Sequence, residues 1–212
     1  MTSRSYKSPR RTAAASLTRG RILAAAAALL GEAGGVSRFS LEAVAKAAGV
    51  TRFTVYSQFG SRSALLEAVF DHRALAAGMG RLPEAMAEPD PCSGLQRLIG
   101  VFCDFWGHDH DTIARLHSVG ASDPEFSQAV RARNERRRQA LSVLVNRMVS
   151  SGFVEKTAAR ELVDVVFALT SFSFFAELTA DGRPVEIVCR HIQNLSADAA
   201  RRANGDPPYR AP

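Results

Sequence analysis

The sequence predicts an all-α protein of about nine helices, with a small three-helix N-terminal helix-turn-helix domain followed by a larger helical domain. Apolar residues recur every three or four positions in each long segment, and no segment shows the strict alternation of a half-buried strand. Gly and Pro are concentrated between Gly78 and Pro91, which predicts a connection between the two parts. The 212 residues suffice for one compact body and one small module.

The expected organisation has three parts, which are a flexible basic arm at residues 1–17, a helix-turn-helix domain with a connecting helix at 18–77, and a helical domain at 78–212. The arm contains basic residues among Ser, Thr and Pro and has little to bury. Thr18 is expected to cap the first helix, and Gly34-Gly35 to end it.

Two short helices and a longer one follow. Ser40 and Thr51 are expected to cap the short helices, because Ser and Thr are preferred N-cap residues. Gly49 lies between them and can adopt the positive φ that a tight turn needs. The expected helices cover residues 41–48, 52–59 and 61–77.

Beyond the connection, every segment that is long enough to judge has a helical pattern. These segments cover residues 95–105, 113–117, 123–152, 158–178 and 184–202. The last two are more apolar than the surface helices of a monomer need to be, so we expect a homodimer interface there. The alternative is that they pack only on their own core. The expected interface residues are Leu162, Val166, Leu169, Val188, Ile192 and Leu195.

Basic charge is concentrated in the first third of the chain. Residues 1–70 contain ten Arg or Lys and three acidic residues, whereas residues 71–212 contain seventeen and eighteen. A polyanion is therefore expected to bind the N-terminal domain, because neutralising phosphates releases condensed counterions.

The segment from Leu41 to Phe59 fits a helix-turn-helix that reads the major groove of DNA. Its second helix places Val55 and Phe59 on one face, and polar or basic residues remain for the other. The run from Ser40 to Arg62, SLEAVAKAAGVTRFTVYSQFGSR, resembles the DNA-binding signature of TetR-type regulators. This resemblance covers residues 18–70.

The resemblance implies that hydroxyl and basic side chains bind phosphates, with Arg62 where the family usually has Lys. The expected phosphate-binding residues are Ser40, Thr51, Tyr56 and Arg62. Arg52 is the best base reader, because a guanidinium can form two hydrogen bonds with guanine. The expected base-reading residues are Arg52, Phe53, Thr54, Ser57 and Gln58. Phe53 departs from the small residue common in the family, so its ring would contact a thymine methyl group or shift the helix.

The resemblance further implies a dimer that binds a near-palindromic double-stranded DNA operator, most often as a repressor, with its C-terminal helices forming a four-helix bundle. Aromatic residues with a few polar neighbours suggest a pocket for a small apolar or aromatic effector, although packing in the core is the alternative. The expected pocket residues are Phe102, Trp106, His117, Met148, Phe167, Thr170 and Phe174. The helix at 61–77 is the expected lever between this domain and the DNA reader.

Other classes of site and function have less support in the sequence. No nucleophile elbow, phosphate-binding loop or HExxH motif argues for an enzyme, and no cofactor or metal is expected. The three cysteines lack metal-site spacing, and His108-Asp109-His110-Asp111 cannot converge on one ion. No run of about 18 apolar residues predicts a membrane span, so a cytoplasmic protein is expected. An architectural DNA-binding protein without an effector is a further alternative.

Overall fold

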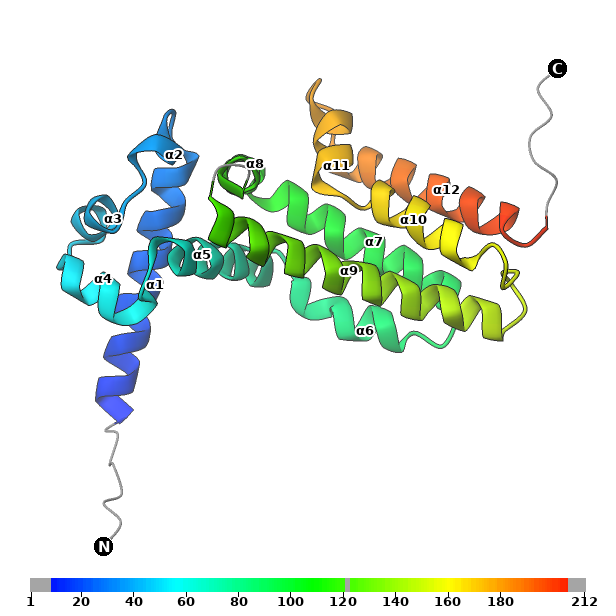
Figure 1. Ribbon diagram of the computed structural model, residues 1–212, viewed down its shortest axis with the longest axis horizontal. Helices are drawn as coiled ribbons and strands as arrows, with labels where there is room; N and C mark the ends of the chain where they lie inside the picture. The colour runs from blue at the N-terminus through cyan, green and yellow to red at the C-terminus, as the bar shows by residue number, and fades with distance from the viewer. Residues whose placement is uncertain (1–8, 121–122, 206–212) are drawn as a thin grey trace, which may run out of the picture. The chain divides into compact units, whose positions relative to one another are not determined.

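The computed structural model of the protein describes residues 9–120 and 123–205, which form twelve α-helices, one 3-10 turn and no strand (Figure 1). The elements are α1 (Pro9–Gly31), α2 (Gly35–Arg38), α3 (Leu41–Ala48), α4 (Arg52–Phe59), α5 (Arg62–Ala76), η1 (Met79–Arg81), α6 (Leu82–Ala87), α7 (Pro91–His108), α8 (His110–Gly120), α9 (Pro124–Ser150), α10 (Ala159–Leu169), α11 (Phe172–Thr179) and α12 (Val185–Arg202). The predicted all-α class is confirmed.

The described residues form two compact units. Unit 1 contains residues 9–72, 111–120 and 123–129, and unit 2 contains residues 73–110 and 130–205. Helices α5, α8 and α9 have residues in both units. Unit 1 therefore includes most of α8. This helix comes later in the chain than residue 77, where the N-terminal domain was expected to end.

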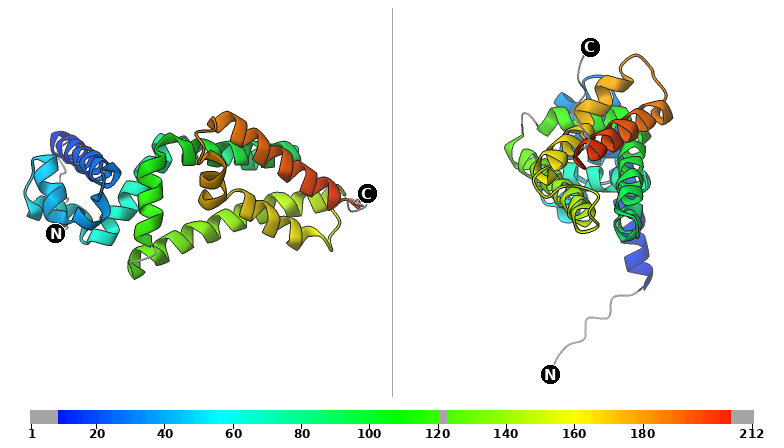
Figure 2. Two further views of the ribbon diagram at one scale, coloured as in Figure 1. Left: turned by 90° about the horizontal axis from the view of Figure 1, so that it is seen from above. Right: turned by 90° about the vertical axis from the view of Figure 1, so that its right-hand side faces the viewer.

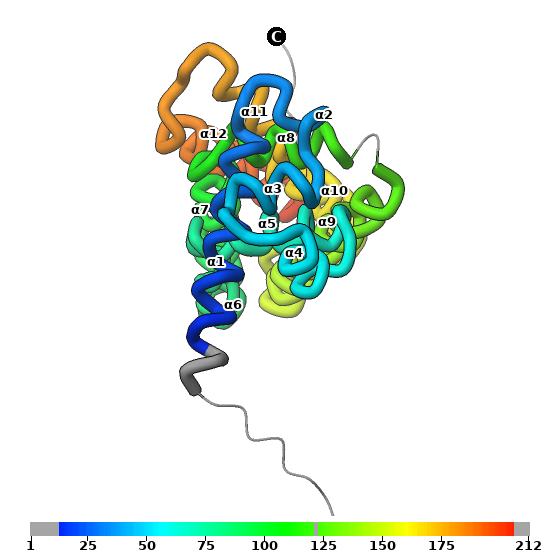
Figure 3. Tube along the Cα trace, turned by 90° about the vertical axis from the view of Figure 1, so that its left-hand side faces the viewer, coloured from blue at the N-terminus to red at the C-terminus, as the bar shows by residue number. Residues whose placement is uncertain are grey.

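Unit 1 is built on α1, which packs against α3, and α3 in turn packs against α4 (Figure 3). Ile22, Ala26 and Leu30 of α1 are fully buried, as are Val44 of α3 and Val55 of α4. Their burial provides the hydrophobic stabilisation of this small domain. The two short helices thus have a firm support behind them.

Helix α1 begins at Pro9, well before the expected start at Thr18. The Thr18 hydroxyl does not cap the helix but donates to the carbonyl of Ala14, at 2.9 Å. Alanines before Thr18 favour helix, which explains the earlier start. Part of the predicted arm is thus helical, and residues 1–8 lie outside the described residues.

Two regions could cross a membrane by length and composition alone. They are Ala13–Gly31 within α1 and the bent pair formed by α10 and α11. Both have a role inside a folded unit, because Ile22 and Leu30 of α1 and Val166 of α10 are fully buried. Core helices of folded domains commonly pass such a test.

Unit 2 is organised around α7, which packs against α6 and α12, while α12 also packs against α10 and α11 (Figure 2). Leu98 and Ile99 of α7 are fully buried, and so is Val188 of α12. This core holds α7 and α12 against each other.

The expected connection at residues 78–91 is largely helical, because it contains η1 and α6. Pro83 lies in the first turn of α6, and Pro91 in the first turn of α7. Proline fits the first turn, where its missing N–H would have no partner within the helix. Asp90 caps α7 by accepting hydrogen bonds from the N–H groups of Cys92 and Ser93. The prolines therefore mark helix starts.

The single helix expected at residues 158–178 is two helices, α10 and α11, bent by 49°. Ser171 causes the restart by accepting a hydrogen bond from the N–H of Phe174, at 3.2 Å. The Thr170 hydroxyl donates to the carbonyl of Val166, at 2.8 Å. Ser and Thr can replace backbone hydrogen bonds in this way and so end one helix and begin the next.

Candidate nucleic-acid interface

Helices α3 and α4 form the predicted helix-turn-helix. The hydroxyl of Ser40 accepts from the N–H of Ala43, and that of Thr51 accepts from the N–H of Thr54, both at 3.1 Å. Gly49 ends α3 with φ 64° and ψ 38°, a left-handed conformation that favours glycine. Both caps and the turn residue were correctly predicted.

The inner face of α4 is apolar and its outer face is open. Val55 is fully buried and Phe59 is 8% exposed, as expected for the side that packs on α3. The outer face consists of four exposed side chains, flanked by half-buried Thr54 and Gln58. The exposed residues are Arg52, Phe53, Tyr56 and Ser57.

Phe53 is the most exposed large apolar residue of α4, at 77%, and Tyr56 is 58% exposed. Two exposed aromatic rings on one short helix are typical of a surface that a binding partner covers. The Tyr56 hydroxyl makes no hydrogen bond with any described residue, so it can donate to an external acceptor. The sequence predicts that both residues contact DNA, and both side chains are exposed enough to do so.

Arg62 has a role inside unit 1 that the sequence did not indicate. Its Nη1 lies 2.7 Å from Asp123 Oδ2, and its Nε donates to the carbonyl of Phe39, at 3.2 Å. Asp123 also accepts from the Ser63 hydroxyl and from the N–H of Phe126. The Arg62 side chain is 35% exposed. Any phosphate contact by Arg62 therefore has to compete with this carboxylate.

Arg19 of α1 holds the end of α4. Its guanidinium lies 4.3 Å from the centre of the Phe59 ring and donates to the carbonyl of Gln58, at 3.4 Å. Cations near the C-terminus of a helix are favourable because the last carbonyls carry partial negative charge. Sequence reasoning missed Arg19 and Asp123, because neither contact has a local signal along the chain.

Three of the expected effector-pocket residues, Phe102, Phe167 and Thr170, contact a buried arginine in unit 2. Arg137 is 6% exposed and donates to the carbonyl of Phe167, at 2.9 Å, and to the Thr170 hydroxyl, at 2.8 Å. Its guanidinium also lies over the rings of Phe167 and Phe102. Burial, and to a lesser extent Arg138, lowers the pKa of Arg137 to about 10.

Trp106, a fourth expected pocket residue, packs beside these three. Its indole N–H donates to the carbonyl of Thr170, at 3.1 Å, and its ring packs on Phe102, Phe105 and Phe172. Trp106 and Phe102 are 4% and 5% exposed. The cluster is thus packed core that fixes the bend between α10 and α11. Of the other expected pocket residues, Phe174 is half-buried in α11 and His117 belongs to unit 1.

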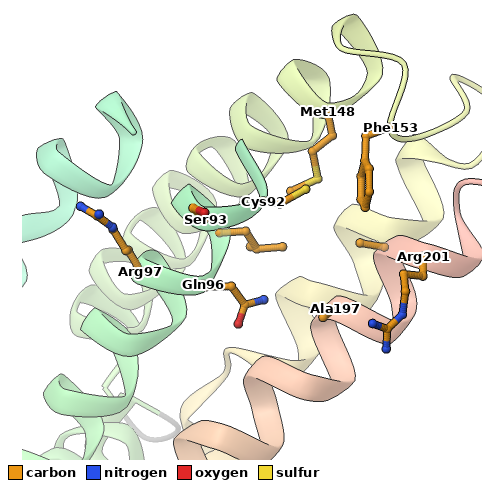
Figure 4. Close-up of a pocket in the computed structure, with 10 residues that line it drawn as sticks. Cys92, Ser93, Gln96, Arg97, Met148, Phe153, Ala197 and Arg201 are labelled. Atoms are coloured by element: carbon orange, nitrogen blue, oxygen red, sulfur yellow. The ribbon is translucent and has the colours of Figure 1, made fainter. Parts of the chain in front are cut away.

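Met148 alone among the expected pocket residues lines a cavity of about 650 Å³ in unit 2 (Figure 4). The walls come from the start of α7, the end of α9 and the end of α12, and they are mostly apolar. Its volume is in the range of small-molecule sites. The lining residues are Cys92, Ser93, Leu95, Gln96, Arg97, Met148, Phe153, Ala197, Ala200 and Arg201.

Most of the expected dimer-interface residues lie in the core of the protomer itself. Each of four is at most 2% exposed, namely Leu162, Val166, Val188 and Ile192. Leu169 is half-buried, and Leu195 is 45% exposed. The apolar stripes of α10 and α12 thus face inward, since helical periodicity identifies a buried face but not what buries it.

The run from His108 to Asp111 does not gather into a metal site. Asp109 pairs with Arg73 at 3.0 Å. Among the described residues, no group of three or more His, Cys, Asp or Glu side chains could hold a metal ion.

Residues 22–69 match the sequence profile of the family described as bacterial regulatory proteins, tetR family. No curated protein matches the chain in sequence. Many solved structures share its fold.

A transcriptional regulator from Rhodococcus sp. Rha1 is 17% identical, with a TM-score of 0.67 over 89% of this chain and 99% of the other. A TetR transcription regulator from Haloarcula marismortui is 16% identical, with a TM-score of 0.70 over 89% and 98%. A protein from Saccharomonospora viridis, solved in complex with choline, is 19% identical, with a TM-score of 0.65 over 84% and 95%. The N-terminal residues 22–69 thus match the tetR family of bacterial regulatory proteins in sequence, and the chain shares its helical fold with these solved regulators.

Proposed function

We propose that the protein is a dimeric repressor that binds a near-palindromic double-stranded DNA operator through α4 and releases it when a small apolar or aromatic effector binds unit 2. The observation that carries this proposal is the outer face of α4. Arg52, Phe53, Tyr56 and Ser57 are exposed together on a capped helix whose inner face is anchored by Val55. A helix of this kind fits the major groove.

Different residues of the helix-turn-helix provide the specificity and the affinity of DNA binding. Arg52 reads a guanine, and Phe53, Thr54, Ser57 and Gln58 add contacts to neighbouring bases. The hydroxyls of Ser40, Thr51 and Tyr56 bind phosphates, which position the helix without reading sequence. Ser40 and Thr51 use an oxygen lone pair for capping, and their hydroxyl hydrogens serve as the donors.

Replacing Arg52 and Tyr56 separately tests this division. Arg52→Ala is expected to weaken the specific complex by roughly 1–3 kcal/mol and to relax the preference at one position of each half-site. Tyr56→Phe is expected to weaken specific and non-specific DNA binding by the same factor, because it removes a phosphate contact. Fluorescence anisotropy with a specific and a scrambled duplex measures both effects.

Arg38→Ala is the matched control, because it removes the same charge from the exposed surface of α2. It should leave the ratio of specific to non-specific affinity unchanged. If Arg38→Ala relaxed the sequence preference as much as Arg52→Ala does, α4 would not be the reading helix. Uniform binding of the wild type to both duplexes would favour an architectural DNA-binding protein.

The dimer interface is proposed on the exposed side of α12. Ile187 and Leu195 are 40% and 45% exposed and are separated by two helical turns, so they lie on one face of the helix. These two side chains replace the buried members of the expected interface. A two-fold dimer would bring together two copies of α4 and so read two half-sites.

Converting both residues to Asp should break the dimer. The double variant Ile187→Asp/Leu195→Asp is expected to raise the dimer dissociation constant by on the order of 100-fold, because it puts charge into an apolar contact. Sedimentation velocity measures the change. Val143→Asp on α9 is the control, since Val143 is 49% exposed and lies on another helix. A double variant that stays dimeric at wild-type concentrations would exclude this face.

The effector site is proposed in the cavity lined by Met148 rather than in the packed cluster around Arg137. The cavity has an apolar wall and a few polar groups at its edge, and the solved structure with choline shows that a protein of this fold can hold a small molecule. The protein acts as a DNA-binding regulator rather than an enzyme, in the cytoplasm, and needs no cofactor or membrane.

Filling the cavity should abolish the response to the effector. Ala197→Phe places a ring where Figure 4 shows the small Ala197 side chain beside the cavity. Compounds that raise the wild-type melting temperature in a screen of apolar and aromatic molecules should lose at least tenfold in affinity for this variant. Its DNA affinity without a ligand should be unchanged. Equal thermal shifts in both proteins would exclude the cavity as the effector site.

A further inference from the structure

Helices α7 and α12 run side by side in unit 2, and a reciprocal pair of hydrogen bonds fixes how they align. The side-chain amide of Gln96 donates to the backbone carbonyl of Gln193, at 3.3 Å. The side-chain amide of Gln193 donates to the backbone carbonyl of Gln96, at 3.0 Å. Both bonds are partly buried, so each residue marks the point on its helix that faces the other.

A glycine gives the second point of alignment. A Cβ atom on Gly107 of α7 would lie 2.8 Å from a methyl carbon of Val185 on α12, closer than side-chain atoms can approach. The absence of a side chain at Gly107 therefore allows the two backbones to come together. Because residue numbers rise along α7 and fall along α12 between these contacts, the two helices are antiparallel.

Cys103 and Cys189 lie between these two points. Cys103 is one turn before Gly107, and Cys189 is one turn after Val185, so the two residues occupy the same level of the paired helices. Their sulfurs lie close enough for a thiol–thiol hydrogen bond to act on the pKa of both groups. Cys103 is buried and Cys189 is half-buried, and both are reduced in this structure.

The hydrogen bond between the sulfurs makes the two thiols unequal. It raises the pKa of Cys103 above the usual value, and burial acts in the same direction. It lowers the pKa of Cys189, because the donated proton stabilises the Cys189 thiolate. The thiolate is the reactive form of cysteine. Cys189 is also the more exposed of the two, so it is the better nucleophile on both counts.

We propose that Cys103 and Cys189 form an oxidisable dithiol pair that a hydroperoxide converts into a disulfide between α7 and α12. The Cys189 thiolate attacks the terminal peroxide oxygen and breaks the O–O bond, which gives a sulfenic acid and releases an alcohol, or water from hydrogen peroxide. The Cys103 sulfur then attacks the sulfenic sulfur, and water leaves as the S–S bond forms. In sum, two thiols and one hydroperoxide give one disulfide, one alcohol and one water.

The disulfide would tie together two helices that also form walls of the 650 Å³ cavity. Leu95 and Gln96 of α7 and Ala197 and Ala200 of α12 line that cavity, on the same helices as the cysteine pair. Oxidation would therefore fix the spacing of these walls. Cys92, which lines the cavity itself, is outside the pair.

Counting thiols in the full-length protein tests the proposal. After treatment with hydrogen peroxide and removal of the oxidant, denatured wild-type protein should have one free thiol in place of three, and its intact mass should fall by about 2 Da. Peptide mapping without reduction should join the peptides of Cys103 and Cys189, and dithiothreitol should restore all three thiols. Cys92→Ser is the control and should form the same cross-link at the wild-type rate.

Single replacements of the pair identify the attacking thiol. Cys189→Ser should lose its remaining thiols at least tenfold more slowly than wild type. Cys103→Ser should accumulate a sulfenic acid on Cys189 that dimedone labels. Three retained thiols in the wild type would overturn the proposal, and so would irreversible oxidation without a cross-link or a disulfide that joins two copies of the chain.

Discussion

Replacing Gly35 by Ala is expected to destabilise unit 1 by about 3–5 kcal/mol, which is exceptional for the addition of one methyl group. A Cβ atom at Gly35 would lie 2.0 Å from the carbonyl oxygen of Leu29 and 2.8 Å from that of Leu30. Both obstacles are backbone atoms at the end of α1, so no side-chain rotation relieves the clash. The turn that leads from α1 through α2 to α3 must therefore move.

Urea unfolding and DNA binding of Gly35→Ala measure this effect together. We expect the unfolding midpoint of unit 1 to fall and specific DNA binding to weaken, because α3 and α4 lose their support. Gly20→Ala is the matched control, since a Cβ atom there meets nothing within 4 Å in the exposed part of α1. It should stabilise the helix by up to about 1 kcal/mol. Wild-type stability of Gly35→Ala would contradict the described junction.

Replacing Trp106 by Ala is expected to destabilise unit 2 by about 3–5 kcal/mol, the usual cost of truncating a buried large aromatic residue. The variant loses the ring packing with Phe102, Phe105 and Phe172 and leaves the carbonyl of Thr170 without the indole donor. The result distinguishes a core residue from a wall of a ligand pocket. Thermal unfolding followed by circular dichroism measures the loss.

Phe53→Ala provides the control for Trp106→Ala, because it also removes an aromatic ring, but one that is 77% exposed. Its stability should stay within about 0.5 kcal/mol of wild type, while its DNA binding changes. Should Trp106→Ala unfold with the wild-type midpoint, Trp106 would belong to an open pocket and the cluster around Arg137 would have to be reinterpreted.

The helix-turn-helix could be predicted in detail because its signals are local. Ser40, Gly49 and Thr51 act on backbone groups within four residues, and the inward face of α4 is visible in the spacing of Val55 and Phe59. Caps, turns and helical periodicity depend on neighbours along the chain, and the sequence displays those neighbours directly.

The contacts that position these helices join residues far apart in the sequence. Arg62 and Asp123 are separated by 61 positions, and Arg137 and Thr170 by 33. Their residue types alone suggest other roles, such as phosphate binding for Arg62. The same limit applies to α12, where periodicity grouped the buried Val188 and Ile192 with the exposed Leu195 and could not show which side of the helix faces a partner.

The effector pocket illustrates a further limit. Phe102, Trp106 and Phe167 are among the residues expected to line a pocket, but they pack together in the core around Arg137. Whether large side chains leave a cavity depends on how they pack, and packing is close to complete in most protein interiors. The cavity occurs instead beside Ala197 and Ala200, where small residues of α12 face α7.

In the proposed dimer, α4 reads DNA sequence as one of a symmetric pair. Selection from a pool of random DNA duplexes, carried out with the wild type and with Arg52→Ala, tests it most directly. The wild type should enrich a near-palindromic motif of two half-sites, each with a guanine that the variant no longer selects. Recovery of the same motif by both proteins, or of no motif by the wild type, would contradict the claim.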